Sequence, residues 1–160
     1  MNKYKLNTLI LLSLAFIATS CGSGSTENSE AETVAEAPAA PMTLEEAEKG
    51  WETNNGVGPI KSLDLPAEID QAMADAGQVV YEAKCTACHK IEKKFIGPSP
   101  KGIMERRTAA WVMNMILDPE GMVAKDPIAR QLLMKFSAPM ANQSLTEEEA
   151  RAVVEYFRTL

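Results

Sequence analysis

Apolar side chains recur at helical spacing through much of the second half of the chain. No stretch alternates apolar and polar residues as a half-buried β-strand does. The first helical segment follows Pro66, a residue that suits a first helical turn, and it continues to Cys85. Its apolar residues lie at helical intervals: Ile69, Met73, Ala76, Val80 and Ala83. The pattern predicts an all-α domain.

Two further helices are marked by their first and last residues. One is expected over residues 108–117, where the dipeptide Asp118-Pro119 should stop it. The next begins at Asp126-Pro127, because an aspartate followed by proline is typical of a helix start. Its apolar residues Ile128, Leu132 and Phe136 share one face. Glycine at residue 121 indicates that residues 119–125 form a loop.

The closing helix has the clearest signature. It begins at Thr146, whose hydroxyl can accept from the backbone while the Glu149 side chain reaches back, an arrangement called a capping box. Its apolar stripe follows the intervals i, i+3, i+4 and i+7: Val153, Tyr156, Phe157 and Leu160. The pairs that Arg151 forms at i,i+4 with Glu147 and with Glu155 are expected on the solvent-exposed side.

The first residues predict export rather than folding. Lys3 and Lys5 precede an apolar stretch, residues 6–19, which is shorter than the roughly 20 residues a membrane-spanning helix needs. Small residues then lead to Cys21, as at a bacterial lipoprotein processing site. We therefore interpret residues 1–20 as a signal peptide and Cys21 as lipidated, which would anchor the exported protein to a membrane on its periplasmic side. The alternative is an ordinary signal peptide cut nearby, with Cys21 incidental.

Charge divides the remainder of the chain. Residues 21–71 carry a net charge of −9 and residues 72–160 a net charge of +1. Residues 21–41 contain mainly Gly, Ser, Thr, Glu, Ala and Pro, a composition that predicts a flexible acidic linker. Residues 42–67 form an N-terminal extension whose order the sequence leaves open, although Thr43 and Glu46 fit a capping box. An acidic chain binds nucleic acid poorly, because neutralising the phosphates needs a basic face, so we expect no nucleic-acid partner.

Cys85-Thr86-Ala87-Cys88-His89 is the motif that carries chemistry. Two thiols at this spacing can form thioethers with both vinyl groups of one haem, and the adjacent His89 then lies beneath the iron. A thioredoxin-like redox pair would need a strand before the motif, where a helix is predicted. A zinc site would need a second pair of ligands, yet His89 is the single histidine and no cysteine follows Cys88. The motif therefore predicts covalent haem attachment.

With this motif in place, residues 68–160 resemble the class I monohaem cytochromes c. Gly77 and Tyr81 resemble the family's residues where the first and last helices cross, and Tyr156 resembles their partner. Gly97-Pro98 resembles the family's Gly-Pro after the haem motif. Pro139-Met140, before the closing helix, resembles its methionine loop, although the family usually places proline after this methionine. The long segment after His89 disfavours the four-helix-bundle cytochromes, whose attachment site lies near the C-terminus.

The resemblance implies the site and its ligands. One haem c per chain would be held by Cys85 and Cys88, with His89 as proximal ligand and the Pro98 carbonyl accepting its Nδ1 proton. Met140 would be the distal ligand, and the runner-up is Met122, placed in the loop expected at residues 119–125. Two other methionines are expected to fill the core: Met113 and Met115. Met104 follows His89 too closely to cross to the other haem face.

The implied function is that of a single-electron carrier without enzymatic activity, working between membrane or periplasmic redox partners. The alternative is a haem-based gas sensor or a peroxidase-like enzyme, which would need an open sixth site. Trp111 is expected to pack in the core and Trp51 to attach the extension to the domain. Seven basic residues cluster around the haem motif: Lys84, Lys90, Lys93, Lys94, Lys101, Arg106 and Arg107. They form either an ordinary solvated face or a basic collar that pairs the haem propionates and guides docking to an acidic partner.

Overall fold

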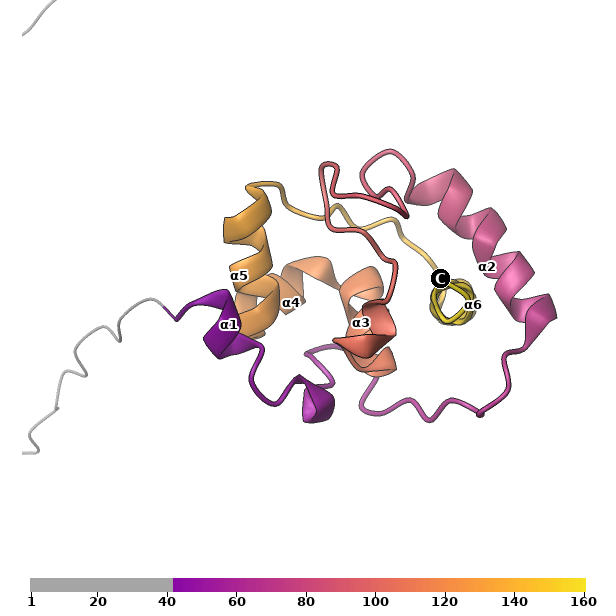
Figure 1. Ribbon diagram of the computed structural model, residues 1–160, viewed down its shortest axis with the longest axis horizontal. Coiled ribbons are helices and arrows are strands. Elements are labelled where there is room, and N and C mark those ends of the chain that lie inside the picture. Colours follow the sequence, from indigo (N-terminus) through magenta and orange to yellow (C-terminus); the bar gives the residue numbers. More distant parts are fainter. Residues whose placement is uncertain (1–41) are drawn as a thin grey trace, which may run out of the picture. The chain divides into compact units, whose positions relative to one another are not determined.

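The structure is a computed structural model that describes residues 42–160. Within this range the chain forms six α-helices and no strand, which confirms the all-α class predicted from the sequence. The helices are α1 (Leu44–Ala47), α2 (Gln71–Lys84), α3 (Ala109–Leu117), α4 (Pro119–Lys125), α5 (Pro127–Phe136) and α6 (Glu147–Phe157) (Figure 1). None of these helices has the length and apolar content needed to cross a membrane. The expectations for the signal peptide, Cys21 and the linker concern residues outside this range.

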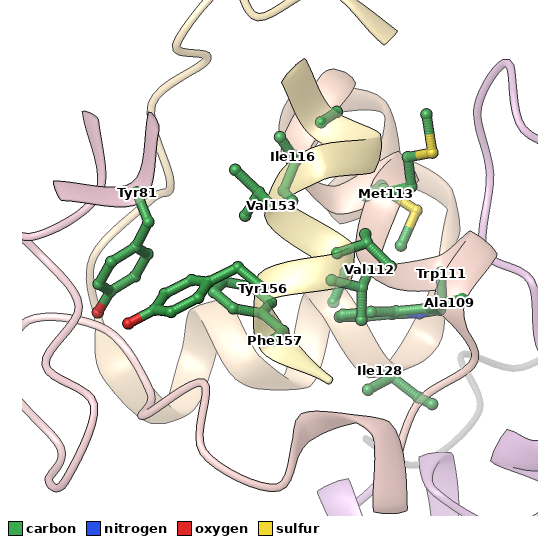
Figure 2. Packing of buried hydrophobic residues seen from close by; sticks show 14 of the residues in the cluster. Tyr81, Ala109, Trp111, Val112, Met113, Ile116, Ile128, Val153, Tyr156 and Phe157 are labelled. Carbon is green, nitrogen blue, oxygen red and sulfur yellow. The ribbon is translucent and has the colours of Figure 1, made fainter. Parts of the chain in front are cut away.

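Helices α2 and α6 cross closely and make the most extensive helix–helix contact of the described chain (Figure 1). Gly77 permits this approach, because a Cβ atom there would overlap the backbone carbonyl of Ala152. Beside this point the ring of Tyr81 lies 5.5 Å from that of Tyr156 and 5.7 Å from that of Phe157. The three aromatic side chains lie together at one end of the core in Figure 2.

The sequence places the start and the buried face of α2 incorrectly. The helix begins at Gln71 and not at Pro66. Asp70 is its N-cap residue, because its carboxylate accepts a hydrogen bond from the Met73 amide. Its fully buried residues are Ala74, Gly77 and Tyr81. Two alanines expected in the apolar stripe are exposed: Ala76 and Ala83. Gly77 lies on the buried face because a larger residue there would overlap the backbone of α6.

Helices α3, α4 and α5 follow one another almost without loops. Each is capped by a side-chain oxygen that accepts from a backbone amide in the first turn, supplied by Thr108, Asp118 and Asp126 respectively. Asp118-Pro119 ends α3 as expected, but it also begins α4, with Pro119 in the first turn. The expected loop over residues 119–125 is therefore wrong. Gly121 lies inside a helix, where its amide donates to the Asp118 carboxylate.

The capping box at Thr146 and Glu149 is present at the start of α6. Glu155, expected on the solvent-exposed side, is instead 1% exposed. It accepts a hydrogen bond from the Asp70 amide (2.9 Å) and forms ion pairs with Arg151 and Arg158 (2.6 Å each). Its burial is compensated because both oxygens have cationic neighbours.

The N-terminal extension packs against the helical domain, which settles a question the sequence leaves open. Asn114 of α3, fully buried, donates to the carbonyls of Asn55 (2.9 Å) and Ile60 (2.8 Å) and accepts from the Ile60 amide (3.0 Å). Asp126 accepts from Asn54 (2.8 Å). Trp51 is half-buried against the core, consistent with its expected role in attaching the extension.

The core lies between α3, α5 and α6. Figure 2 shows Val112 and Ile116 of α3 near Val153 of α6, with Ile128 of α5 below them. Trp111 is 3% exposed and packs in this core as expected, and its indole N–H donates to the Asp126 carboxylate (3.1 Å). One indole therefore joins α3 to the start of α5.

Candidate functional site

A cavity of about 490 Å³ opens beside the core, within the size range of ligand sites. Its walls come from the end of α2, residues 96–100, helices α3 and α5, and the segment before α6. It brings together all the site residues expected for haem: Cys85, Cys88, His89, Pro98 and Met140. Three of these lie within five residues of one another, whereas Pro98 and Met140 reach the cavity from separate segments.

The end of α2 positions the cysteines and the histidine. Cys85 is the C-cap residue, and its amide donates to the Tyr81 carbonyl (2.9 Å). Its own carbonyl accepts from the amides of Cys88 (3.0 Å) and His89 (2.9 Å), so the chain makes one tight turn. Both thiols and the imidazole thereby line one cavity. Burial, reinforced by the nearby Cys88, raises the pKa of the Cys85 thiol, which favours its protonated form in the unreacted chain.

His89 is held by its surroundings in one orientation. Its Nδ1 lies 2.7 Å from the Pro98 carbonyl oxygen, which can only accept, so Nδ1 carries a proton and, in the neutral imidazole, Nε2 keeps a lone pair. The Tyr81 hydroxyl donates to the His89 carbonyl (2.8 Å). Gly97 lies so near that a Cβ atom there would be 2.5 Å from His89 Cε1. This ring can therefore offer Nε2 to a metal ion.

Met140 lies in the segment between α5 and α6, half-buried against the core. The segment begins at Ser137, which adopts a left-handed conformation (φ 54°) and ends α5. It is fixed farther along by Asn142, whose side chain donates to the Leu117 carbonyl (3.1 Å) and accepts from the Ser144 amide (2.7 Å). These bonds give the methionine segment a defined course without a proline after Met140.

The other methionines differ in their access to the cavity. Met122 lies on α4, is fully buried, and accepts a hydrogen bond at sulfur from the Val57 amide (3.0 Å). Because Met122 lies on a helix, its expected position in a loop is wrong. It also does not line the cavity. Met113 is buried in the core as expected. Met115, expected to fill the core, packs against the core and also lines the cavity.

Positive charge gathers at the cavity wall. Three residues of the basic cluster line it: Lys84, Arg106 and Arg107. Lys101 instead pairs with Glu92 (2.7 Å) on the surface. Sequence reasoning missed that Leu44 and Glu48 of the extension also line the cavity. No local signal revealed this, because the contact joins segments about sixty residues apart.

The residues present fit a haem. Two thiols, an imidazole with a free Nε2 and a thioether line one largely apolar cavity, and these are the groups that bind haem covalently and ligate its iron. Arg107 is 4% exposed at the same cavity, and its Nε has no acceptor among residues 42–160. A buried donor of this kind suits the carboxylates of haem. Over the same range no cluster of three or more His, Cys, Asp or Glu residues offers another metal site.

Comparisons with known proteins relate the chain to cytochromes c. A family model described as cytochrome c matches residues 74–160. Cytochrome c-551 of Stutzerimonas stutzeri is 25% identical over 107 residues, which cover 64% of this chain and 93% of that protein. Cytochrome c from Rhodothermus marinus has a TM-score of 0.63 at 34% identity, covering 74% of this chain and 96% of that chain. An engineered form of the latter, bound to a carbene intermediate, has a TM-score of 0.60 at 38% identity, covering 64% and 88%.

Proposed function

Because the chain belongs to the cytochrome c family, whose members bind one covalently attached haem c, we propose that it carries single electrons through a His/Met-ligated haem. In this proposal Cys85 and Cys88 form the two thioethers, His89 is the proximal ligand and Met140 the distal ligand. The observation that carries it is the cavity at which one turn of chain presents both thiols and the imidazole while the segment before α6 presents Met140.

The surrounding residues explain how such a site would work. The haem, when bound, supplies a one-electron couple between ferric and ferrous iron. The Pro98 carbonyl fixes the His89 ring and increases the donor strength of Nε2. The Met140 thioether favours reduced iron, which raises the reduction potential. The apolar cavity walls limit the access of water and thereby influence that potential.

Replacement of Met140 tests the ligand set. We expect Met140→Ala to keep covalent haem but to lose the weak far-red absorption band of ferric iron bound to sulfur, and to bind carbon monoxide faster. The matched control is Met122→Ala, which truncates a buried methionine that does not line the cavity and should keep the band. An unchanged ferric spectrum in Met140→Ala would remove Met140 from the site. Rapid carbon monoxide binding by the wild-type protein would favour the gas-sensor or peroxidase-like alternative.

Replacement of the cysteines tests the covalent attachment. We expect the double variant Cys85→Ala/Cys88→Ala to lose haem staining on a denaturing gel, because neither thioether can form. Met122→Ala again serves as the control that retains staining. Normal staining of the double variant would contradict the proposed attachment.

We also propose that the protein is exported and anchored on the periplasmic side of a membrane by a lipid on Cys21, and that it exchanges electrons with redox proteins nearby. The residues before Cys21 support this, as does the length of residues 22–41, which span about 70 Å when fully extended. Anchoring would raise the effective concentration of the haem domain near partners in the same membrane. We expect Cys21→Ser to keep normal haem but to deliver electrons to a membrane-bound acceptor more slowly. Equal delivery at equal abundance would exclude a role for the anchor.

A further inference from the structure

Arg107 occupies an unusual position for a charged residue. It precedes α3, lines the cavity and is 4% exposed. Its guanidinium carbon lies 5.2 Å from the centre of the Trp111 ring, so the group is stacked near an aromatic face. One terminal nitrogen donates to the Arg106 carbonyl and the other to the Glu48 carboxylate (2.5 Å). Nε alone has no acceptor among residues 42–160.

The neighbouring Arg106 differs, because its guanidinium is engaged with the backbone. It donates to the carbonyls of Ser99 (2.8 Å), Lys101 (2.9 Å) and Gly102 (2.7 Å), and so fastens the segment that follows Pro98. Its terminal nitrogens are therefore used within the protein. Arg107 is the arginine at this cavity that has a buried donor without a protein partner among the described residues.

Glu48 ties Arg107 to the N-terminal extension. It is the C-cap residue of α1 and lines the cavity together with Leu44 of the same helix. Helix α1 also packs against α5. The family model begins only at residue 74, so Glu48 lies outside the part of the chain that this model matches. The extension thus brings one negative charge to a largely apolar wall whose other charged residues are basic: Lys84, Arg106, Arg107 and Lys135.

We propose that Glu48 is a positioning residue that holds Arg107 with its Nε directed to a haem carboxylate, and that the Glu48–Arg107 pair sets the reduction potential of the bound haem. This proposal rests on the proposed haem function. A guanidinium with one nitrogen held by a carboxylate loses less rotamer freedom when it binds a second carboxylate, so the pair is preorganised. The low exposure of Arg107 keeps its charge poorly screened.

The two charges should move the potential in opposite directions. Oxidised haem has one more positive charge than reduced haem, so a nearby anion stabilises the oxidised form and lowers the potential. Loss of the Glu48 charge should therefore raise the potential, and loss of the Arg107 charge should lower it. Each effect includes the partner left unpaired, so the two single changes should not add in the double variant.

The test is a spectroelectrochemical titration of purified holoprotein with Glu48→Gln, Arg107→Gln and the double variant. We expect the ratio of reduced to oxidised haem at a fixed applied potential to rise roughly three- to tenfold in Glu48→Gln and to fall in Arg107→Gln. Glu45→Gln is the matched control, because Glu45 lies on the same helix but is exposed and does not line the cavity. It should leave the ratio nearly unchanged.

Two results would overturn the proposal: a Glu48→Gln potential equal to that of the wild type, or an equal rise in Glu45→Gln, which would indicate net charge alone. Glu48 is partly exposed, so Glu48→Gln should fold even if Arg107→Gln does not. The ferric sulfur–iron band is recorded on every variant. If the wild-type protein lacks this band, the His/Met proposal fails. If the band is present and the potential of Glu48→Gln equals that of the wild type, only the present proposal fails.

Discussion

Gly77→Ala tests whether the crossing of α2 and α6 or the intrinsic helix propensity decides stability at this position. Glycine in a helix interior is less favourable than alanine by about 0.8–1.0 kcal/mol. Propensity alone therefore predicts that the variant is more stable. The structure predicts the opposite, because the added Cβ would overlap the Ala152 carbonyl oxygen.

The size of the effect follows from what the new methyl group meets. An extra carbon in a well-packed core costs about 1–3 kcal/mol. Here the obstacle is backbone of α6, which cannot rotate away as a side chain can, so the upper end applies. Subtracting the gain of about 1 kcal/mol in propensity leaves a net loss of about 2 kcal/mol.

The assay is equilibrium unfolding of the holoprotein in guanidinium chloride, monitored by tryptophan fluorescence. The matched control is Ala76→Gly, the reverse change at an exposed neighbouring position of the same helix, which measures the propensity difference without the crossing. We expect both variants to be destabilised, Ala76→Gly by about 1 kcal/mol. A Gly77→Ala protein as stable as the wild type, or more stable, would show that α6 moves aside at little cost and would refute the reasoning.

Two further predictions concern buried polar residues. Asn114→Ala removes three hydrogen bonds to the extension and should cost about 3 kcal/mol, with faster amide hydrogen exchange at Ile60; unchanged exchange there would contradict this. Burial raises the pKa of Glu155, but the Asp70 amide, Arg151 and Arg158 together lower it from 4.5. Its ionised form therefore stabilises the fold above about pH 4.5, and this contribution is lost as the pH falls through the lower folded-state pKa. The unfolding free energy of Glu155→Gln should lie about 2 kcal/mol below that of the wild type at pH 7 and approach it in acid, whereas a constant difference would exclude this linkage.

Three helix starts are predicted correctly from a local capping residue, although Asp70, which caps α2 in the same way, is missed. Thr108, Asp126 and Thr146 each accept a hydrogen bond from an amide three residues on, so the information lies within one turn of chain. The same logic applied to Asp118 would have found α4. The sequence indicates only the end of α3 at this point, because a proline in the next position breaks a preceding helix and starts a new one equally well.

Burial was predicted less well where it depends on a partner far away in sequence. The charged pattern of α6 is that of a solvent-exposed face, and yet Glu155 is buried. The segment before α2 covers it, because an amide of this segment donates to Glu155 and two of its carbonyls accept from Arg158. Ala76 and Ala74 are equivalent as residue types. Only the position of α6 decides which of them is buried.

The candidate haem site also combines features set by neighbouring residues with features set by distant ones. The two thiols and the imidazole lie within five residues, and a single turn of chain brings them to the cavity. Their spacing in the sequence is therefore enough to predict haem chemistry. The acidic residue on the wall was not recognised, because Glu48 lies in a segment whose order the sequence left open and whose partner is 59 positions away. The residues proposed to attach the haem covalently lie close together in sequence, whereas the pair proposed to adjust its potential joins two distant segments. A chain extension of this kind can change the properties of a redox site without altering the motif that builds it.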